Sequence, residues 1–229
     1  MRILALETSA KACSAAVTED GEVIGSSFLC TGLTHSRVLM PMVQSMLETA
    51  GLKVDDCDAV AVAVGPGSFT GIRIGIAAAK GLAFAANKPA VGISTLEAMA
   101  TGVSCMDGLI VCAMDARRAQ VYNAVFSARD GVLTRLTPDR PIALDDLREE
   151  LKKDEKRKII VGDGAHLCYT NFLENQIPCV MAPSHLRMQS AVSVALAAEA
   201  AMREGRSVSA QDLAPVYLRP VQIGRKKSE

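Results

Sequence analysis

The sequence predicts an α/β fold made of two similar halves, each with a mixed sheet and flanking helices. An apolar run, an acid, an alternating strand and an Asp-Gly turn follow one another over residues 4–21 and again over 111–131. An apolar run, a glycine turn and a helical segment occur in that order from 62 and again from 159. Any α/β protein repeats strand, turn and helix, but both correspondences here keep the same order and an offset of roughly one hundred residues. We therefore expect a duplicated unit.

The first half is expected to open with three antiparallel strands. These strands are predicted at 3–6, 12–17 and 23–28. Asp20-Gly21 is a hairpin turn signal between the second and the third. Apolar residues at helical spacing then predict a helix over 33–50, with Thr34 as its N-cap and Gly51 at its end. Pro41 is awkward in that helix because it removes a backbone donor.

A buried central strand and a second helix complete the first half. In the predicted strand at 58–64, the uninterrupted apolar run that follows Asp58 is typical of a strand covered on both faces. The loop 65–71 follows, and an Ala- and Ile-rich helix is predicted over 72–86. A short strand at 89–92 leads to a short helix that ends near residue 100, with Ser94 as its N-cap.

The same order of strands, turns and helices is predicted for the second half. Strands are expected at 109–114, 120–126, 132–136 and 159–161, and helices at 144–151, 166–173 and 190–204. We place the domain boundary between 1–103 and 104–229, with the end of the chain packing back on the first domain.

Composition limits the classes of function. The chain has 229 residues, 25 Lys plus Arg against 25 Asp plus Glu, 3% aromatic residues and no Trp. A protein that grips nucleic acid by itself normally has a basic surplus, and base stacking needs aromatic rings. The basic clusters are 152–158, which is mixed with acids, and the tail at 225–227.

The cysteines and the start of the chain predict a cytoplasmic protein. There are 7 cysteines, without C-x-x-C spacing, which argues against a disulfide framework and a thiolate metal site. We expect no signal peptide, and the longest apolar stretch, 59–64, is too short to span a membrane.

Polar residues at two strand ends and in the glycine loop are candidates for a vestigial phosphate site. A loop between a strand and a helix exposes amides that attract anions, but it lacks the Gly-Lys-Ser/Thr of a P-loop. The alternative is that these residues are structural turns, and both interpretations remain open. The candidates are Glu7, Thr8, Ser9, Gly65, Gly67, Ser68, Thr70, Gly71, Arg73 and Asp115.

The apolar stripes of the predicted helices at 34–50 and 72–86 have two interpretations. They pack in the core, or they form a surface for a partner protein. The helix at 34–50 has few charges between Val38 and Leu47, which favours a surface used in addition to a core contact. His35, His166 and His185 are too scattered for a local metal motif.

Several motifs resemble the bacterial TsaB family, which serves threonylcarbamoyladenosine synthesis in tRNA. They are Leu6-Glu7-Thr8-Ser9, Thr34-His35-Ser36, the segment 64–75 followed by Ala78-Lys80-Gly81-Leu82, Met114-Asp115-Ala116-Arg117-Arg118 with Val121-Tyr122, and Pro215-Val216-Tyr217-Leu218-Arg219. The resemblance covers essentially the whole chain. It implies the actin-like ATPase superfold (ASKHA), in agreement with the duplicated halves.

The resemblance implies a non-catalytic scaffold. The modification lies at position 37 of tRNAs that read codons beginning with A, and TsaD transfers the threonylcarbamoyl group. TsaB would bind TsaD and the ATPase TsaE, form a homodimer in isolation and meet tRNA only through the complex. No metal is expected, because Leu39 stands four residues after His35 where TsaD-like proteins place a second histidine. No cofactor is expected to bind tightly, and ATP or ADP would enter at the level of the complex.

The resemblance also assigns a partner interface to the first two helices. Its predicted residues are His35, Val38, Leu39, Met42, Val43, Met46, Ile72, Ile76, Ala79 and Lys80. The alternative function is an independent actin-fold ATPase or phosphotransferase, or an M22-type peptidase-like enzyme, although no nucleophile–base pair is visible.

Overall fold

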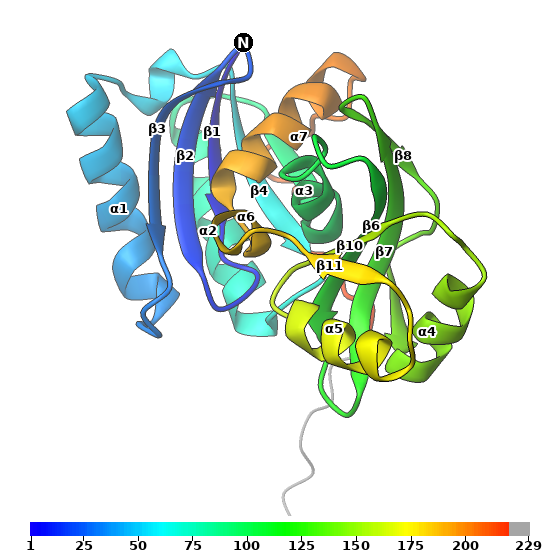
Figure 1. The fold of residues 1–229 in the computed structure, drawn as a ribbon. Coiled ribbons are helices and arrows are strands. Elements are labelled where there is room, and N and C mark those ends of the chain that lie inside the picture. The colour runs from blue at the N-terminus through cyan, green and yellow to red at the C-terminus, as the bar shows by residue number, and fades with distance from the viewer. Residues whose placement is uncertain (220–229) are drawn as a thin grey trace, which may run out of the picture.

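The computed structural model describes residues 1–219, which form two mixed sheets with helices between and around them (Figure 1). The predicted basic tail at 225–227 lies outside the described residues. Among residues 1–219, the structure contains no helix with the length and apolar character that a membrane crossing requires.

The first sheet has the strand order β3-β2-β1-β4-β5. Its strands are β1 (Arg2–Glu7), β2 (Cys13–Glu19), β3 (Glu22–Leu29), β4 (Ala59–Gly65) and β5 (Ala90–Ser94). The first three strands are antiparallel, as predicted, and β4 runs parallel to both β1 and β5. Every residue of β4 is buried, which confirms the predicted central strand.

The second sheet repeats this order as β8-β7-β6-β10-β11. Its strands are β6 (Gly108–Asp115), β7 (Gln120–Arg129), β8 (Val132–Arg135), β10 (Lys158–Val161) and β11 (Cys179–Met181), and β9 (Arg140–Ala143) pairs with β7. In both sheets the first strand pairs antiparallel with its hairpin partner on one side and parallel with a later strand on the other. The predicted duplication is therefore confirmed by topology.

Each half sends its last helix onto the sheet of the other half. Helices α1 (His35–Ala50) and α2 (Phe69–Ala85) cover one face of the first sheet, and α7 (Ala191–Arg203) covers the opposite face. Helices α4 (Leu144–Lys152) and α5 (Ala165–Glu174) cover one face of the second sheet, and α3 (Thr95–Thr101) covers the other.

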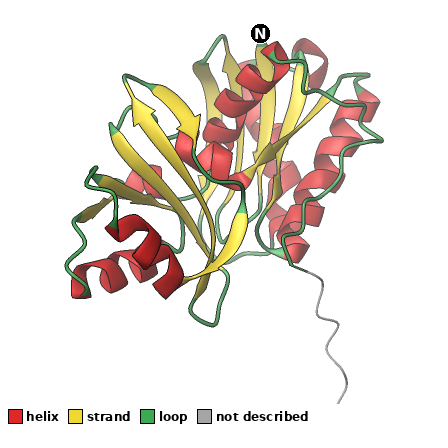
Figure 2. Ribbon diagram, turned by 90° about the vertical axis from the view of Figure 1, so that its right-hand side faces the viewer, coloured by secondary structure: helices red, strands yellow, loops and turns green. Residues whose placement is uncertain are grey.

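Helices α3 and α7 consequently lie together between the two sheets (Figures 1 and 2). Their approach is close, because a Cβ at Gly102 would lie 2.3 Å from Ser193 Oγ. The centre of the molecule is thus a helical layer shared by both halves.

Some boundaries differ from the predictions for local reasons. Helix α2 begins at Phe69 rather than at 72, because the Ser68 hydroxyl accepts a hydrogen bond from Gly71 N and caps the helix within the glycine loop. Thr34 is the N-cap residue of α1, but its side chain makes no capping hydrogen bond. The short elements β9, β11, α6 (Ser184–Arg187) and the 3-10 turn Val54–Asp56 were not predicted.

Residues 205–219, which we call the C-terminal strap, run along the first half and then cross to the second. Val208 pairs with Ala90 of β5, and Val216 N donates to Val64 O at 2.8 Å. At its end, Arg219 Nη1 donates to Ala116 O in the second half at 2.9 Å. The strap therefore links the two halves.

Candidate functional site

The β1–β2 turn packs directly on the glycine loop. Thr8 Oγ1 donates to Gly71 O at 2.8 Å, and a Cβ at Gly71 would lie 2.1 Å from Thr8 O. A Cβ at Gly67 would lie 2.3 Å from Ser9 O. These contacts give a packing reason for glycine at both positions, and they favour the structural interpretation of the loop.

The predicted polar turn faces inward. Glu7, Thr8 and Ser9 are all fully buried. Glu7 Oε1 accepts a hydrogen bond from Ser9 N at 2.5 Å, whereas Glu7 Oε2 has no partner among the described residues. Burial raises the pKa of Glu7 to about 7, although the Ser9 hydrogen bonds oppose the shift. A fully buried carboxyl of this kind does not fit a role beside a bound phosphate.

The counterpart strand end in the second half does reach a pocket. Asp115 is exposed, and its Oδ1 accepts a hydrogen bond from Arg117 N at 2.7 Å. Asp163, in the second glycine turn, accepts from Gln189 Nε2 at 2.8 Å, and burial raises the pKa of its carboxyl. Both residues line a pocket of about 560 Å³ together with Ser9 and Ser68. The two predicted strand ends thus converge on one pocket between the halves.

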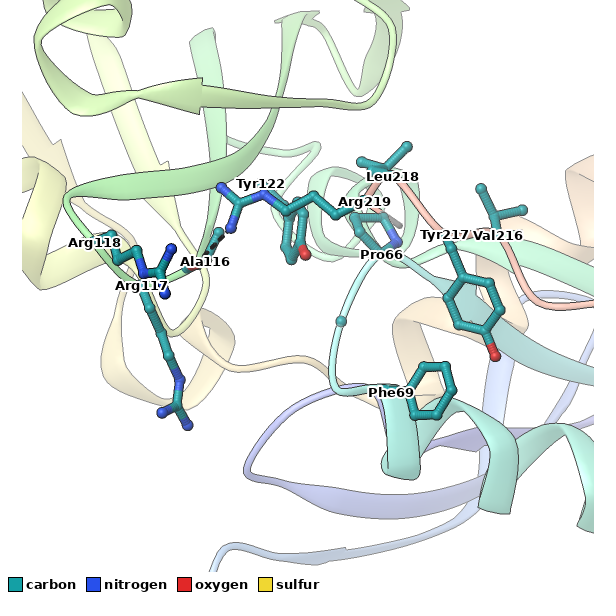
Figure 3. A pocket seen from close by; sticks show the side chains of 11 residues that line it. Pro66, Phe69, Ala116, Arg117, Arg118, Tyr122, Val216, Tyr217, Leu218 and Arg219 are labelled. Carbon is teal, nitrogen blue, oxygen red and sulfur yellow. Dashed lines mark hydrogen bonds between the residues drawn. The ribbon is translucent and has the colours of Figure 1, made fainter. Parts of the chain in front are cut away.

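A neighbouring pocket of about 510 Å³ carries arginines and aromatic rings (Figure 3). Phe69 and Tyr217 lie on one side, and Arg117 and Arg118 lie on the other. Arg219 lies between them, with its guanidinium 5.3 Å from the centroid of the Tyr122 ring.

Sequence reasoning did not assign this second pocket. Arg118, Tyr122, Tyr217 and Arg219 belong to segments that carry the family resemblance, but none was a site candidate. The available signal was the Arg117-Arg118 pair, which follows Asp115 after one intervening alanine. The contribution of the strap to this pocket could not be predicted from the local sequence around Asp115. Arg219 comes from about one hundred residues further along the chain.

The ten predicted interface residues divide into two groups. Seven are buried in the core of the first half: Leu39, Met42, Val43, Met46, Ile72, Ile76 and Ala79. His35, Val38 and Lys80 are half-buried. The His35 Nε2 is hydrogen-bonded to Ala10 O at 2.8 Å, and Lys80 Nζ donates to Gln211 O in the strap at 2.9 Å. The core interpretation therefore accounts for seven of these side chains, and an additional interface role stays a prediction.

Helices α1 and α2 expose a different set of apolar or small residues. We call this set the α1–α2 outer face; it comprises Met40, Pro41, Ala77, Gly81 and Phe84. The exposed fraction of the Phe84 residue is 70%, and that of Met40 is 42%. Large exposed apolar side chains on neighbouring helices are typical of a docking surface.

Metal ligands do not gather in the part of the chain that the structure describes. Within residues 1–219, no group of three or more His, Cys, Asp or Glu side chains could hold a metal ion.

Comparisons with known proteins identify the family. The family described as "TsaD: tRNA N6-adenosine threonylcarbamoyltransferase" matches residues 31–220. The Escherichia coli protein "tRNA threonylcarbamoyladenosine biosynthesis protein TsaB" is 34% identical over 222 residues, covering 96% of this chain and 95% of the relative.

Solved structures agree with this relationship. "YeaZ from Pseudomonas aeruginosa" superposes with a TM-score of 0.78 at 28% identity, covering 95% of this chain and 99% of that chain. Component A of the Acidaminococcus fermentans (R)-2-hydroxyglutaryl-CoA dehydratase has a TM-score of 0.51 at 14% identity, covering 88% and 99%, and shows only the shared actin-like fold. With its duplicated mixed sheets and its match along almost the whole length of these relatives, the chain belongs to the TsaB family, within the larger TsaD family of actin-like proteins.

Proposed function

We propose that this chain is a non-catalytic subunit for the formation of N6-threonylcarbamoyladenosine at position 37 of tRNAs that read codons beginning with A. In this proposal it binds a TsaD-type transferase, and the ATPase TsaE joins the pair. Its kinship with the E. coli TsaB over almost the entire chain supports the pathway. No catalytic step is assigned to this chain.

The α1–α2 outer face carries the partner assignment. Phe84 projects from α2 with most of its surface exposed, beside the small residues Ala77 and Gly81 that let another helix approach closely. Burying the exposed Phe84 and Met40 side chains against a second apolar helix surface removes apolar area from water. A second copy of this chain offers the same face, and we propose a homodimer through it when the transferase is absent.

The burial of Glu7 in the β1–β2 turn supports the assignment of the chemistry to the partner. Glu7 is fully buried and its Oε1 accepts a hydrogen bond from Ser9 N, so the carboxyl is not presented to a ligand. The transferase chemistry is then the task of the partner, and this chain contributes a docking surface. The alternative of an independent ATPase or peptidase has no specific observation in its favour among the described residues.

Reconstitution tests the proposal. The TsaD-type transferase and TsaE of the same organism are assayed on unmodified tRNA with and without this chain, and the modified nucleoside is quantified by mass spectrometry. We expect modification only when all components are present, and loss of modification with Phe84→Asp. Val132→Asp is the matched control, because Val132 is 67% exposed but lies on β8 of the other half. Full modification without this chain would refute the proposal.

A further inference from the structure

We infer that the outer edge of β3 pairs with β3 of a second copy of this chain, antiparallel about a two-fold axis at Ser27. The two first-half sheets then become one continuous sheet. β3 is the end strand of the first sheet, on the side of the molecule away from the second half (Figure 1). This edge shares no residue with the α1–α2 outer face, so the inference goes beyond the proposed function and does not rest on it.

The backbone of β3 is available for pairing. Within residues 1–219, β3 pairs with β2 only, and the backbone of 23–33 makes no backbone hydrogen bond with any other element. In an end strand, the N–H and C=O groups that point away from the neighbouring strand are left to water or to an added strand. Such an edge is a template for the addition of a further strand.

The side chains of β3 do not protect this edge. Neither a charged residue nor a proline occurs between Glu22 and Thr34. A bulge at Ile24, which has no partner in β2, affects only the start of the strand. Edge strands that resist addition usually carry charges, prolines or a disrupting bulge. Five large apolar side chains in this stretch instead have exposed fractions of 37–52%: Val23, Ile24, Phe28, Leu29 and Leu33.

The terminal strands at the other ends of the two sheets are protected. β5, at the opposite edge of the first sheet, is covered by the strap, where Val208 pairs with Ala90. In the second sheet β11 has only three residues, and β8 has four and ends at Arg135, which is paired with Asp139. Short strands and charged ends hinder addition. After β3 pairs with β3, the strap still covers the β5 edges, so assembly by this route stops at two copies.

The regular part of β3 is self-complementary about Ser27. With Ser27 of both copies on the two-fold axis, Phe28 of one copy lies opposite Ser26 of the other. Leu29 likewise lies opposite Gly25. Each large side chain therefore meets a small one, which allows the backbones to approach to pairing distance without a clash.

Pairing in this register buries apolar surface on both faces of the joined sheet. Gly25 faces α1, because a Cβ there would lie 3.4 Å from Met46 Cγ. Since side chains alternate along a strand, Leu29 shares the α1 face and Phe28 lies on the opposite one. Each copy thus removes one large exposed side chain from water on each face, which favours association.

Charge and availability favour a second copy as the occupant. Glu22 of one copy stands near the uncharged residues 30–33 of the other, so the two glutamates lie at opposite ends of the paired segment. An extended segment of another protein could use the same backbone groups. An exposed apolar edge, however, needs an occupant that is present whenever the chain is, and a second copy meets that condition.

Sedimentation of the full chain tests the inference. All the proteins carry Phe84→Asp, which removes the separate dimer proposed through the α1–α2 outer face. Ser26→Lys is the test variant, because Ser26 is exposed on β3 and a lysine there brings one charge from each copy near the two-fold axis. Thr134→Lys is the matched control, because Thr134 is an exposed hydroxyl residue on the edge strand β8. Thermal melting of each variant checks that the fold is intact.

We expect the Phe84→Asp chain to be dimeric, Ser26→Lys to weaken dimerisation at least roughly tenfold and Thr134→Lys to leave it within about twofold. The inference is overturned if the Phe84→Asp chain is monomeric at concentrations up to roughly 100 μM. It is also overturned if Ser26→Lys leaves dimerisation unchanged or if both lysine variants weaken it equally. Reconstitution of the tRNA modification does not measure this contact, so failure here leaves the proposed function standing.

Hydrogen exchange supplies a readout without a substitution on β3. In the Phe84→Asp chain, amides of 23–29 should exchange several-fold more slowly at high protein concentration than at low, and those of β8 should not change. Exchange that is independent of concentration at 23–29 would overturn the inference.

A titration with the TsaD-type transferase separates the other occupant. It uses Ser26→Lys and Thr134→Lys chains that retain Phe84, and we expect both to bind the transferase as wild type does. A loss of transferase binding specific to Ser26→Lys would assign the edge to the transferase and overturn the inference.

Discussion

Gly75 of α2 lies directly against Thr8 at the end of β1. A Cβ at Gly75 would stand 2.3 Å from Thr8 Oγ1, closer than any real contact, and that hydroxyl is already committed to Gly71 O at 2.8 Å. The first turns of α2 therefore rest on the β1–β2 turn without space for a side chain. This contact positions α2, and with it the outer face that we assign to the partner.

The first prediction compares two glycines of the same helix. Gly75→Ala should destabilise the protein by about 1–3 kcal/mol, because the added methyl group must displace Thr8 or the helix. Gly81→Ala should be neutral or stabilise it by about 0.5–1 kcal/mol, because a Cβ there meets nothing within 4 Å and alanine favours the helix. Urea unfolding of both variants measures the difference, and equal effects would contradict the packing argument.

The fold was largely predictable because its signals are local and repeated. The Asp20-Gly21 turn has positive φ at both residues, as a tight hairpin requires, and the apolar run of β4 marks a strand covered on both faces. The strands β9 and β11 were missed because they are short and half-exposed, and their pairing depends on partners distant in sequence. Alternation of polar and apolar residues is too weak over three or four positions to indicate them.

The second prediction concerns the pH dependence of stability. The pKa of Glu7 is about 7 in the folded chain and 4.5 in the unfolded reference, so the folded state binds more protons between these values. Stability therefore falls as pH rises through this window and levels off above it. Glu7→Gln removes the titrating group, so its stability relative to wild type should be higher at pH 8 than at pH 5, by at most about 3 kcal/mol.

Chemical denaturation at the two pH values provides the measurement. Glu22→Gln is the control, because Glu22 is an exposed glutamate at the start of β3, and its effect should be the same at both. A Glu7→Gln variant whose relative stability does not change with pH would show that the buried carboxyl is ionised throughout.

The third prediction concerns the thiols. Of the seven cysteines, Cys30 and Cys105 are exposed and Cys179 is half-buried; the four buried ones are Cys13, Cys57, Cys112 and Cys168. Burial also raises the pKa of the Cys13 thiol to about 11, which suppresses its reactive thiolate. A disulfide reagent such as Ellman's should modify two cysteines rapidly in the native protein and the four buried ones only after unfolding. Rapid reaction of four or more would contradict the described packing.

The candidate site was less predictable than the fold. Residues of the β1–β2 turn looked like ligands for a phosphate because they are polar and end a strand, yet Glu7 is enclosed by its own loop. Helical spacing likewise marked Met42 and Ile76 without distinguishing their core packing from a partner contact. The exposed Phe84 was missed because exposure depends on which side of α2 the sheet covers.

The scarcity of aromatic residues did not indicate where in the fold the few rings lie. Only 3% of the chain is aromatic, which argued against base stacking. The fold nevertheless gathers Phe69, Tyr122 and Tyr217 around one pocket from three distant segments. The aromatic content is an average over the whole chain, whereas the rings that line a pocket are brought together by the fold.

The central claim is that the α1–α2 outer face docks the TsaD-type transferase, and its most direct test is the affinity of the pair. The transferase of the same organism is titrated into this chain by calorimetry, using wild type, Phe84→Asp and Val132→Asp. We expect wild type and Val132→Asp to bind equally well, and Phe84→Asp to bind at least roughly tenfold more weakly while keeping its melting temperature. Undiminished binding by Phe84→Asp, or no binding by wild type, would contradict it.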